Sequence, residues 1–565
     1  MGTKAPAPTS TELTIPRRRL GLLLAGLLLL LLLVSSRTVW LQSVQNQTLT
    51  KYATTQQQNT QPLPAVRGAI VDRNGITLAI GEQAVTFFGD PRLIKQRDRI
   101  GVAQQVADIL GLTKSEREQL VTRLEDATGG FVYVARQVPQ ERAKLLQEAK
   151  ITGIGSNPEE KRMYPQKTVA GQLIGAVDTD GRGIDGMELL YNNSLTGTPG
   201  QQVSVRDPSG VPIDVRKLVR ERDGKPVQLT IDSVIQENTE RVLAETVKKF
   251  SAENGQAIVM NPKTGEIYAF ASVPLVDPGK WSASTGNQKR LGPVSHVYEP
   301  GSTFKIVTIS GALEDGVVQR NTQLDVPAIR VFCKEKKTCS VVDAEKRSGP
   351  EMMTTEQILV KSSNLGTIAI AERLKKANLD RWITKFGFGS RTGIDFPGEE
   401  IGMRTPLKDW SAVSIGNIPI GQGISVTPIQ VASAYATIAN GGLRVQPHLL
   451  AKVGDEPAPR AKTKRILSEK TSAIMRSMFG GVVRSENGTG NAAQIQNYEV
   501  GGKTGTASIA DENGYNKQDY VASFVGFVPT ENPQLVTMVV IRKPRGGIYG
   551  GTVAAPAFEQ ITKFA

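Results

Sequence analysis

An unbroken apolar run near the N-terminus places the strongest constraint on how this chain can fold. Residues 20–34 read LGLLLAGLLLLLLLV, and three arginines stand directly before them. In a bilayer, such a segment satisfies its backbone polar groups only as a helix. We expect a transmembrane helix over residues 20–36 and a cytoplasmic tail over residues 1–19, because basic residues flank the cytoplasmic end of a membrane helix. A cleaved signal peptide is the alternative, and it would also export the chain.

The remainder is therefore expected outside the cytoplasmic membrane, and it divides into three stretches. Residues 37–65 are rich in Gln, Thr and Asn and end in prolines, which predicts a stalk or linker. Residues 66–225 mix strand and helix patterns without a group of side chains suited to chemistry, and we expect a non-catalytic pedestal there. Residues 226–565 begin and end with strand patterns around a helical middle. This order predicts an α+β domain with a central antiparallel sheet flanked by helices.

Composition argues against a nucleic-acid partner and against a metal site. The net charge is +14, but the basic residues are scattered, with no zinc-finger spacing, no RNA-recognition motif and no long basic block, so we expect no nucleic-acid partner. Only two histidines and two cysteines occur. We therefore expect no metal site, and no cofactor. Cys333 and Cys339 are expected to form a disulfide in an oxidising compartment, or else to remain two thiols.

A serine and a lysine three residues apart form the first candidate catalytic pair. Pro300 and Gly301 interrupt the chain just before Ser302, and an apolar helical pattern follows. Ser302 is therefore expected at the start of a helix, with Lys305 on the same face. A serine hydroxyl needs a neighbouring base to act as a nucleophile. A lysine can be that base only if burial or cationic neighbours lower its pKa.

Two further motifs follow in a consistent order. Ser362 and Asn364 stand two residues apart in a segment that reads as a turn between helices. Lys503, Thr504 and Gly505 begin a predicted strand, where the glycine would let a substrate backbone approach closely. The combination S-x-x-K, S-x-N and K-T-G is typical of serine enzymes that react with β-lactams.

The chain also contains copies of these motifs in unsuitable places. Residues 263–265 read KTG, but they precede the serine and are expected in a hairpin turn. Residues 485–487 read SEN and are expected in a loop. Order and context therefore select the triplet at 302, 362 and 503.

At this point the chain resembles the class B penicillin-binding proteins, the monofunctional peptidoglycan transpeptidases, over residues 66–565. The segment YEPGSTFK around the serine is similar to the corresponding segment in the division branch of that family. Besides the three motifs, the resemblance is carried by five segments: RGAIVDRNG (67–75), KRMYP (161–165), GIDGMELLY (183–191), GQGISVTPIQVASAYATIANGG (421–442) and GGTVAAPAF (550–558).

The resemblance implies a role for each motif residue. Ser302 would attack the penultimate D-Ala carbonyl of a stem peptide and expel the terminal D-Ala, with Lys305 as its base. An amine of a neighbouring stem would then resolve the acyl-enzyme and form a cross-link. Ser362 would relay the proton to the leaving group, and Asn364 would contact the acyl part of the donor.

The strand motif would bind the donor terminus. Lys503 and Thr504 would hold the terminal carboxylate, and Gly505 would let the substrate approach. The backbone N–H groups of Ser302 and Thr506 would form the oxyanion hole. β-Lactams would acylate Ser302.

The family resemblance also implies binding partners, and it leaves alternative functions open. The pedestal of such proteins docks other wall-synthesis proteins, and a glycosyltransferase of the shape-elongation-division-sporulation (SEDS) type is expected as a partner. An elongation or sporulation branch and a catalytically silent scaffold remain open alternatives to septal cross-linking. A β-lactamase and a β-lactam sensor are further rivals, although no deacylating carboxylate motif and no H-E-x-x-H motif is apparent. His296, close to the serine in sequence, is expected to be a loop histidine without a catalytic role.

Overall fold

The computed structural model describes residues 17–45, 58–206, 212–333, 340–511 and 514–565. It divides into two compact units, one with residues 1–64 and 199–222 and one with residues 65–198 and 223–565. The Cys339 half of the predicted disulfide lies outside the described residues, so that pairing stays a prediction.

The smaller unit contains the apolar helix α1 (Arg17–Ser43). Within the described residues, α1 alone is long and apolar enough to cross a membrane. It extends beyond the predicted residues 20–36 at both ends, because the flanking residues 17–19 and 37–43 contain no proline or glycine to end the helix. Its 27 residues span about 40 Å at a rise of 1.5 Å each, which exceeds a hydrocarbon core of about 30 Å. Arg37 stacks over Trp40 at 4.5 Å near its C-terminal end.

A three-stranded antiparallel sheet completes the smaller unit. Its order is β1 (Gln58–Leu63), β6 (Gly200–Arg206) and β7 (Pro212–Val219). Residues 58–63 were expected to belong to a linker, but they pair with β6 along its length. Backbone pairing does not require apolar side chains, so a polar segment can form an edge strand that composition alone does not reveal.

The central sheet of the larger unit is antiparallel and is built from both ends of residues 226–565, as predicted. The two hairpin strands near the start of this segment lie beside three strands from its end. The spatial order is β10 (Ile267–Val273), β9 (Asn254–Met260), β23 (Leu535–Arg542), β22 (Gly514–Val528) and β21 (Gly501–Asp511).

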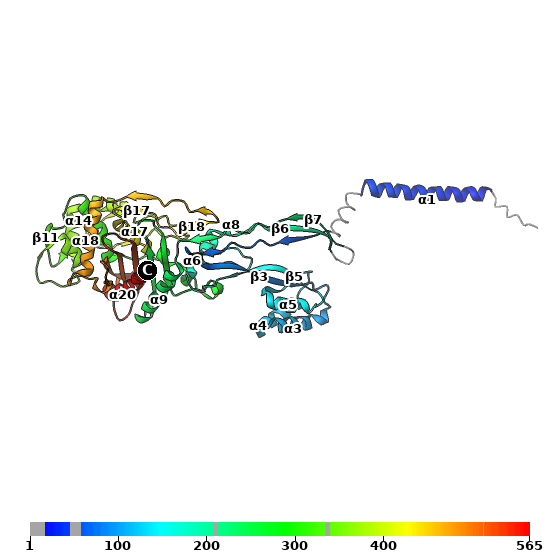
Figure 1. Cartoon of the computed structure of the whole chain (residues 1–565), viewed down its shortest axis with the longest axis horizontal. Helices are drawn as coiled ribbons and strands as arrows, with labels where there is room; N and C mark the ends of the chain where they lie inside the picture. The colour runs from blue at the N-terminus through cyan, green and yellow to red at the C-terminus, as the bar shows by residue number, and fades with distance from the viewer. Residues whose placement is uncertain (1–16, 46–57, 207–211, 334–339, 512–513) are drawn as a thin grey trace, which may run out of the picture. The chain divides into compact units, whose positions relative to one another are not determined.

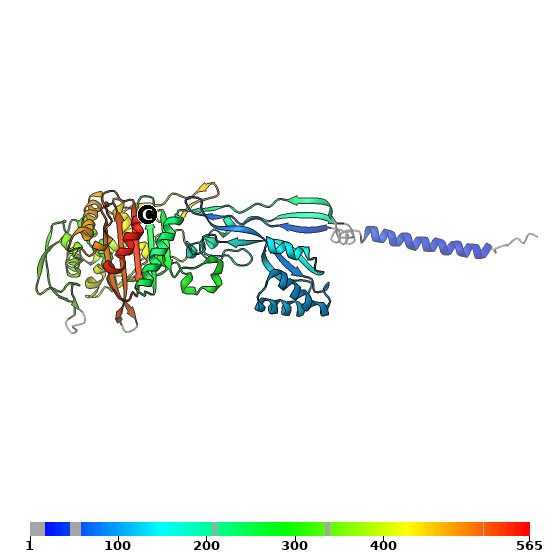
Figure 2. The same ribbon diagram turned by 60° about the horizontal axis from the view of Figure 1, so that its bottom comes forward.

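Helices cover both faces of this sheet, because alternate strand residues face opposite sides and both sides are apolar. Ala257 and Val259 pack with α9 (Ser233–Lys249) and α20 (Ala555–Phe564), which lie side by side in Figure 2. Ile258 and Met260 belong to the larger core on the opposite face. There the covering helices are α12 (Lys305–Glu314), α17 (Pro428–Ala439) and α18 (Glu469–Arg484) (Figure 1).

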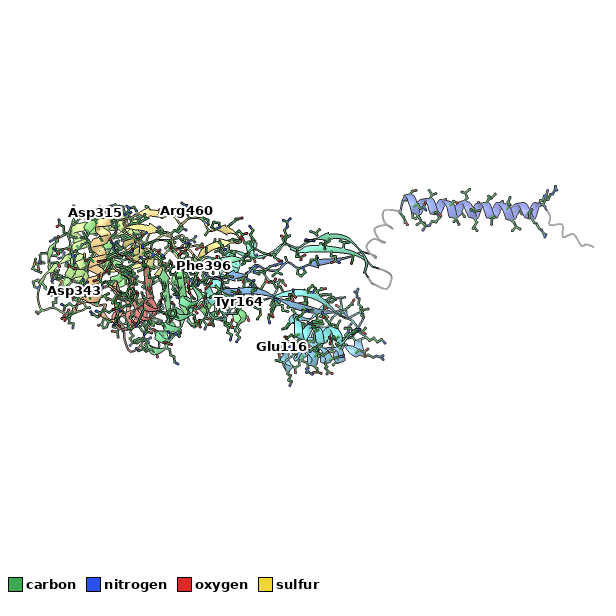
Figure 3. The ribbon with its side chains drawn as sticks, viewed as in Figure 1. Glu116, Tyr164, Asp315, Asp343, Phe396 and Arg460 are labelled. Atoms are coloured by element: carbon green, nitrogen blue, oxygen red, sulfur yellow. The ribbon has the colours of Figure 1, made fainter. Side chains whose placement is uncertain are left out.

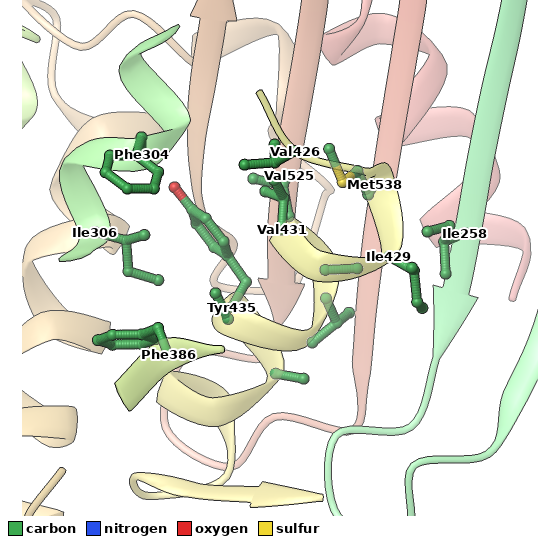
Figure 4. Packing of buried hydrophobic residues seen from close by; sticks show 14 of the residues in the cluster. Ile258, Phe304, Ile306, Phe386, Val426, Ile429, Val431, Tyr435, Val525 and Met538 are labelled. Carbon is green, nitrogen blue, oxygen red and sulfur yellow. The ribbon is translucent and has the colours of Figure 1, made fainter. Parts of the chain in front are cut away.

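Tyr435 links this core to the turn that carries the candidate nucleophile. Its ring is completely buried in α17, and its hydroxyl donates to the Thr303 carbonyl at 3.0 Å. Figure 4 shows the hydroxyl pointing toward Phe304, whose ring packs edge-on against Phe388 at 5.0 Å. A buried tyrosine hydroxyl with a partner gives orientation as well as apolar burial, so it fixes the serine turn against the core.

A second sheet crosses the boundary predicted between residues 225 and 226. β2 (Ile70–Val71) pairs in parallel with β8 (Val227–Leu229), which in turn pairs with β18 (Leu450–Val453). That boundary therefore separates two portions of one compact unit. We keep the name pedestal portion for residues 66–198 of this unit. Within it, β2 and the long strand β3 (Thr77–Gly89) form a hairpin through the turn at Gly75, whose φ of +83° favours glycine.

The pedestal portion ends in a small helix-covered sheet. Strands β4 (Val132–Pro139) and β5 (Ile154–Met163) flank β3. Three helices pack on one face, in the positions where the sequence predicts helical periodicity. These are α3 (Arg99–Leu110), α4 (Lys114–Glu125) and α5 (Gln140–Glu148).

A buried ion network joins three of the sequence segments that carry the family resemblance. Glu188 is inaccessible to solvent and bonds to both Arg67 and Arg162 at 2.7 Å. Two arginines on one buried carboxylate offset its desolvation, and the bonds constrain three distant segments to meet. This arrangement explains why RGAIVDRNG, KRMYP and GIDGMELLY contain these charges at otherwise apolar positions.

Candidate active site

Ser302 lies in a single 3₁₀ turn, η3 (Gly301–Phe304), that leads directly into α12. Gly301 has a φ of +55°, and a Cβ there would stand 2.9 Å from the carbonyl oxygen of Thr506. Only glycine combines that conformation with that approach. The chain before Ser302 is therefore pressed against strand β21, as the order of the motifs predicts.

Lys305 is completely buried one turn after Ser302. Its Nζ donates to the Ser362 carbonyl at 2.6 Å and to Asn364 Oδ1 at 2.9 Å, and lies 3.3 Å from Ser362 Oγ. Burial lowers the pKa of Lys305 to about 7, against the opposing effect of the Asp343 carboxylate. A large fraction of this lysine is consequently neutral at neutral pH and able to accept a proton.

Ser362 stands between the lysine and the candidate nucleophile. It lies between α13 (Thr355–Val360) and α14 (Asn364–Leu374), as predicted, and its Oγ is 3.0 Å from Ser302 Oγ. In the part of the chain that the structure describes, Lys305 Nζ has no hydrogen bond to Ser302 Oγ. The hydroxyl of Ser362 therefore completes a chain of contacts between them. Ser362 holds this place with a φ of +58°, a conformation that costs free energy for a residue with a Cβ.

Lys503 and Thr504 lie on β21 at the edge of the sheet. Lys503 is completely buried, and both its burial and the charge of Lys305 lower its pKa well below the ordinary value. Its Nζ lies 3.4 Å from Thr504 Oγ1. An anionic ligand beside Lys503 would favour its protonated form and offset part of the cost of burying that charge.

Gly505 and Thr506 bring β21 against the serine turn. A Cβ on Gly505 would lie 2.4 Å from Ser523 Oγ and 3.0 Å from the Pro300 carbonyl. Thr506 Oγ1 accepts a hydrogen bond from the Gly550 backbone at 3.1 Å. The structure thus brings the three motifs together around Ser302.

Asp343 is a site residue that sequence reasoning missed. It accepts hydrogen bonds from Ser363 Oγ (2.8 Å), the Asn364 N–H (2.6 Å) and the Leu365 N–H (3.0 Å), and so caps the N-terminus of α14. Arg347 bonds to the same carboxylate at 2.8 Å. Figure 3 shows Asp343 toward the end of the larger unit opposite to Glu116 of α4. A helix N-terminus needs an acceptor, but the sequence does not indicate that a distant aspartate supplies it.

Thr489 is a second residue that the sequence analysis passed over. Its Oγ1 lies 2.7 Å from Thr504 Oγ1 and 3.5 Å from Lys503 Nζ. The available signal was the tripeptide GTG at residues 488–490, directly after the SEN copy. Thr489 adds a third hydroxyl-bearing side chain to the strand motif.

The copied motifs remain outside this cluster. Residues 263–265 form the β9–β10 turn, where Gly265 has a φ of +83°. Residues 485–487 follow the C-terminus of α18. His296 Nδ1 contacts Gln256 Nε2 at 3.1 Å. Among the described residues, no group of three or more His, Cys, Asp or Glu side chains is suited to a metal ion.

Comparison with known proteins gives two family models that together cover most of the chain. Residues 255–563 match the penicillin binding protein transpeptidase domain, and residues 62–229 match the penicillin-binding protein dimerisation domain.

Individual relatives extend along nearly the whole sequence. Stage V sporulation protein D of Bacillus subtilis is 32% identical over 98% of this chain and 86% of its own length. The peptidoglycan D,D-transpeptidase FtsI of Escherichia coli is 31% identical over 96% of this chain and 90% of its own. Among solved structures, penicillin binding protein 3 of Mycobacterium tuberculosis complexed with ampicillin aligns with a TM-score of 0.68 and 29% identity, covering 89% of this chain and 95% of that one.

Proposed function

The chain belongs to the class B penicillin-binding proteins of the FtsI type, peptidoglycan D,D-transpeptidases of cell-wall synthesis, and we propose that Ser302 is its nucleophile. The single observation that carries this assignment is the chain of contacts from Ser302 Oγ through Ser362 Oγ to Lys305 Nζ. Such a protein acts on peptidoglycan stem peptides and binds β-lactams.

The first half-reaction transfers the donor acyl group to the enzyme. Ser302 Oγ attacks the penultimate D-Ala carbonyl and gives its proton to neutral Lys305, for which Ser362 Oγ provides the path. The proton then passes back through Ser362 to the leaving nitrogen, and the C–N bond breaks to release D-Ala. In the second half-reaction the amine of a neighbouring stem attacks the ester, which forms the cross-link and frees Ser302.

The remaining motif residues bind and orient the donor. Asn364 contacts the acyl portion, and Lys503 with Thr504 holds the terminal carboxylate, which the 3.4 Å approach of Lys503 Nζ to Thr504 Oγ1 supports. Gly505 leaves room for the substrate. The N–H groups of Ser302 and Thr506 form the oxyanion hole, which the close packing of η3 on β21 supports.

The protein is membrane-anchored, and the finer placement is part of the proposal. We assign α1 as a single-pass anchor in the cytoplasmic membrane, with the N-terminus inside and the catalytic portion outside, because basic residues precede it. We assign residues 66–225 as the pedestal that docks division or wall-synthesis proteins and 226–565 as the transpeptidase domain. A SEDS-type glycosyltransferase is the proposed polymerase partner, and the division septum is the proposed place of action.

A labelling experiment tests the nucleophile. The purified protein is incubated with a fluorescent penicillin beside Ser302→Ala and the control Ser485→Ala, which changes the copied motif. We expect a covalent band in the wild type and the control, and none in Ser302→Ala. A band that fades within minutes would favour a β-lactamase, and no band from folded wild type would favour a silent scaffold.

A further inference from the structure

A polar cavity lies apart from the Ser302 site, where β9 begins and β10 ends. Its volume is about 630 Å³, and none of the motif residues lines it. Gln172, from the pedestal portion, forms one wall, and the remaining wall comes from residues 253–542. A smaller cavity of about 350 Å³ shares Gln172, Arg290, Ser295 and Glu400 with it, so the two are neighbours.

Side-chain amides fixed by the protein form its deepest lining. Gln172 and Gln256 are each only 3% exposed. Gln172 Nε2 donates to the Pro274 carbonyl at 2.7 Å, and Gln256 Nε2 donates to Asn254 Oδ1 at 2.6 Å. Within the described residues, neither glutamine Oε1 has a hydrogen-bond donor. Both amide oxygens are therefore free to accept a hydrogen bond from a ligand in the cavity.

His296 presents a defined hydrogen-bonding pattern beside these amides. An amide nitrogen can only donate, so the 3.1 Å contact from Gln256 Nε2 makes His296 Nδ1 the acceptor and leaves the proton on Nε2. Burial, with the charges of Arg290 and Arg542 adding to it, lowers the pKa of His296 below its ordinary value, so the ring is neutral at neutral pH. The ring therefore supplies one further N–H donor.

Two loose ion pairs provide charge of both signs. Arg290 lies 3.6 Å from Glu400, and Arg542 lies 3.5 Å from Glu253. All four side chains are 30–52% exposed. Exposed pairs at such distances contribute little free energy, so a ligand can replace either partner of the Arg290–Glu400 pair, or Glu253 on Arg542, at small cost. Glu253 keeps a second partner in Lys543 at 3.0 Å.

We propose that this cavity binds a short zwitterionic peptide. The free amide oxygens of Gln172 and Gln256 match the N–H groups of a peptide backbone, the His296 N–H matches a backbone C=O, and the two ion pairs match its charged ends. A sugar ring would favour a wall of Phe, Tyr or Trp, and none of these lines the larger cavity. An apolar ligand would find only Val273, Pro274 and Val297.

The cavity is connected to the nucleophile by one short segment. Residues 296–302 run from its wall to the catalytic turn. Tyr298 pairs in both directions with Val426 at 2.9 and 3.0 Å, and the Gly301 N–H donates to the Gly421 carbonyl at 3.0 Å. An occupant that touches His296 therefore contacts the same hydrogen-bonded segment that ends at Ser302.

Calorimetry on the full-length protein tests the proposal. Ser302 is first acylated with benzylpenicillin, so that the catalytic site is closed, and L-alanyl-γ-D-glutamyl-L-lysine is then titrated. We expect saturable binding that Arg290→Glu weakens at least tenfold. Arg465→Glu is the matched control, because Arg465 is equally exposed and also forms a long ion pair, with Glu469 at 3.5 Å, yet it lines neither cavity.

A second titration distinguishes a wall-derived peptide from a general zwitterionic peptide. All-L, α-linked L-alanyl-L-glutamyl-L-lysine has the same charges. Equal affinity would identify a general zwitterionic peptide, and weaker binding would identify wall-derived peptide; both support the site. No saturable binding to the wild type, or binding that Arg290→Glu leaves unchanged, would overturn it. Acylation of Ser302 is recorded beforehand, so failure here leaves the proposed function standing.

Discussion

Ser362 Oγ lies 3.0 Å from Ser302 Oγ, and the residue that carries it has a backbone φ of +58°. The strained conformation keeps the hydroxyl between Lys305 and Ser302, the proposed nucleophile. Loss of the hydroxyl should therefore reduce catalysis without harming the fold.

The first prediction distinguishes the effect of the Ser362 hydroxyl on acylation from the effect of its backbone conformation on stability. Ser362→Ala and Ser362→Gly should both slow acylation by penicillin about 10²–10⁴-fold, the usual range for a proton-transfer group. The glycine variant should be more stable than the alanine variant by about 1 kcal/mol, because glycine accepts a positive φ. Stopped-flow acylation and urea unfolding measure the two effects. Equal acylation by Ser362→Ala and wild type would exclude the relay.

The second prediction concerns pH. The base must be neutral, and burial lowers the pKa of Lys305 to about 7. The acylation rate should therefore be level above pH 8 and fall about tenfold per unit below pH 6, as Lys305 becomes protonated. Acylation rates of a stable β-lactam between pH 5 and 9 check this. A rate that keeps rising about tenfold per unit up to pH 9, without levelling off, would show that the lysine keeps its ordinary pKa.

The third prediction concerns the aspartate that caps α14. Asp343→Asn should destabilise the fold by about 3–5 kcal/mol, because Arg347 loses the carboxylate of a largely buried pair. It should also slow acylation, since Ser363 and Asn364 lose their anchor. Asp325→Asn, on the exposed face of the neighbouring strand β11 (Gln323–Val326), is the control and should change neither quantity. Unchanged acylation in Asp343→Asn would remove Asp343 from the site.

The fourth prediction concerns the buried network of the pedestal portion. Glu188→Gln leaves Arg67 and Arg162 buried without a countercharge and should cost about 3–5 kcal/mol of unfolding free energy. Glu456→Gln is the matched control. Its pair with Lys225 is largely exposed, and its loss should cost less than about 1 kcal/mol. Similar urea midpoints for the two variants would contradict the prediction.

The fifth prediction concerns the packing of β21 on the serine turn. Gly505→Ala would place a Cβ 3.0 Å from the Pro300 carbonyl and 2.4 Å from Ser523 Oγ. Ser523 or the strand must shift, so acylation should fall at least tenfold. Gly286→Ala, where a Cβ meets nothing within 4 Å, should acylate as wild type does. Normal labelling of Gly505→Ala would show that β21 adjusts without cost.

The sequence predicted the main sheet and the order of the three motifs, because each depends on local patterns of side chains. Asp343 could not be predicted, since its role depends on a contact with a helix that begins about twenty residues later. The pairing of residues 58–63 with β6 could not be predicted either. An edge strand is stabilised by backbone hydrogen bonds, which do not require a particular pattern of polar and apolar side chains. Thr489 stands close to the SEN copy in the sequence. Its place in the site could not be predicted, because it depends on a contact with Thr504 that only the fold creates.

The shared sheet of β2, β8 and β18 also determines where the chain can be cut. A fragment that begins at Pro226 would lose β2 and leave β8 as an open edge, with unpaired backbone groups and the apolar surface of Val227 and Leu229 uncovered. Open edges of that kind recruit strands from other molecules. A soluble version that drops the anchor should therefore keep the chain from about residue 58 onward, whereas the shorter catalytic fragment should aggregate even with every motif residue present.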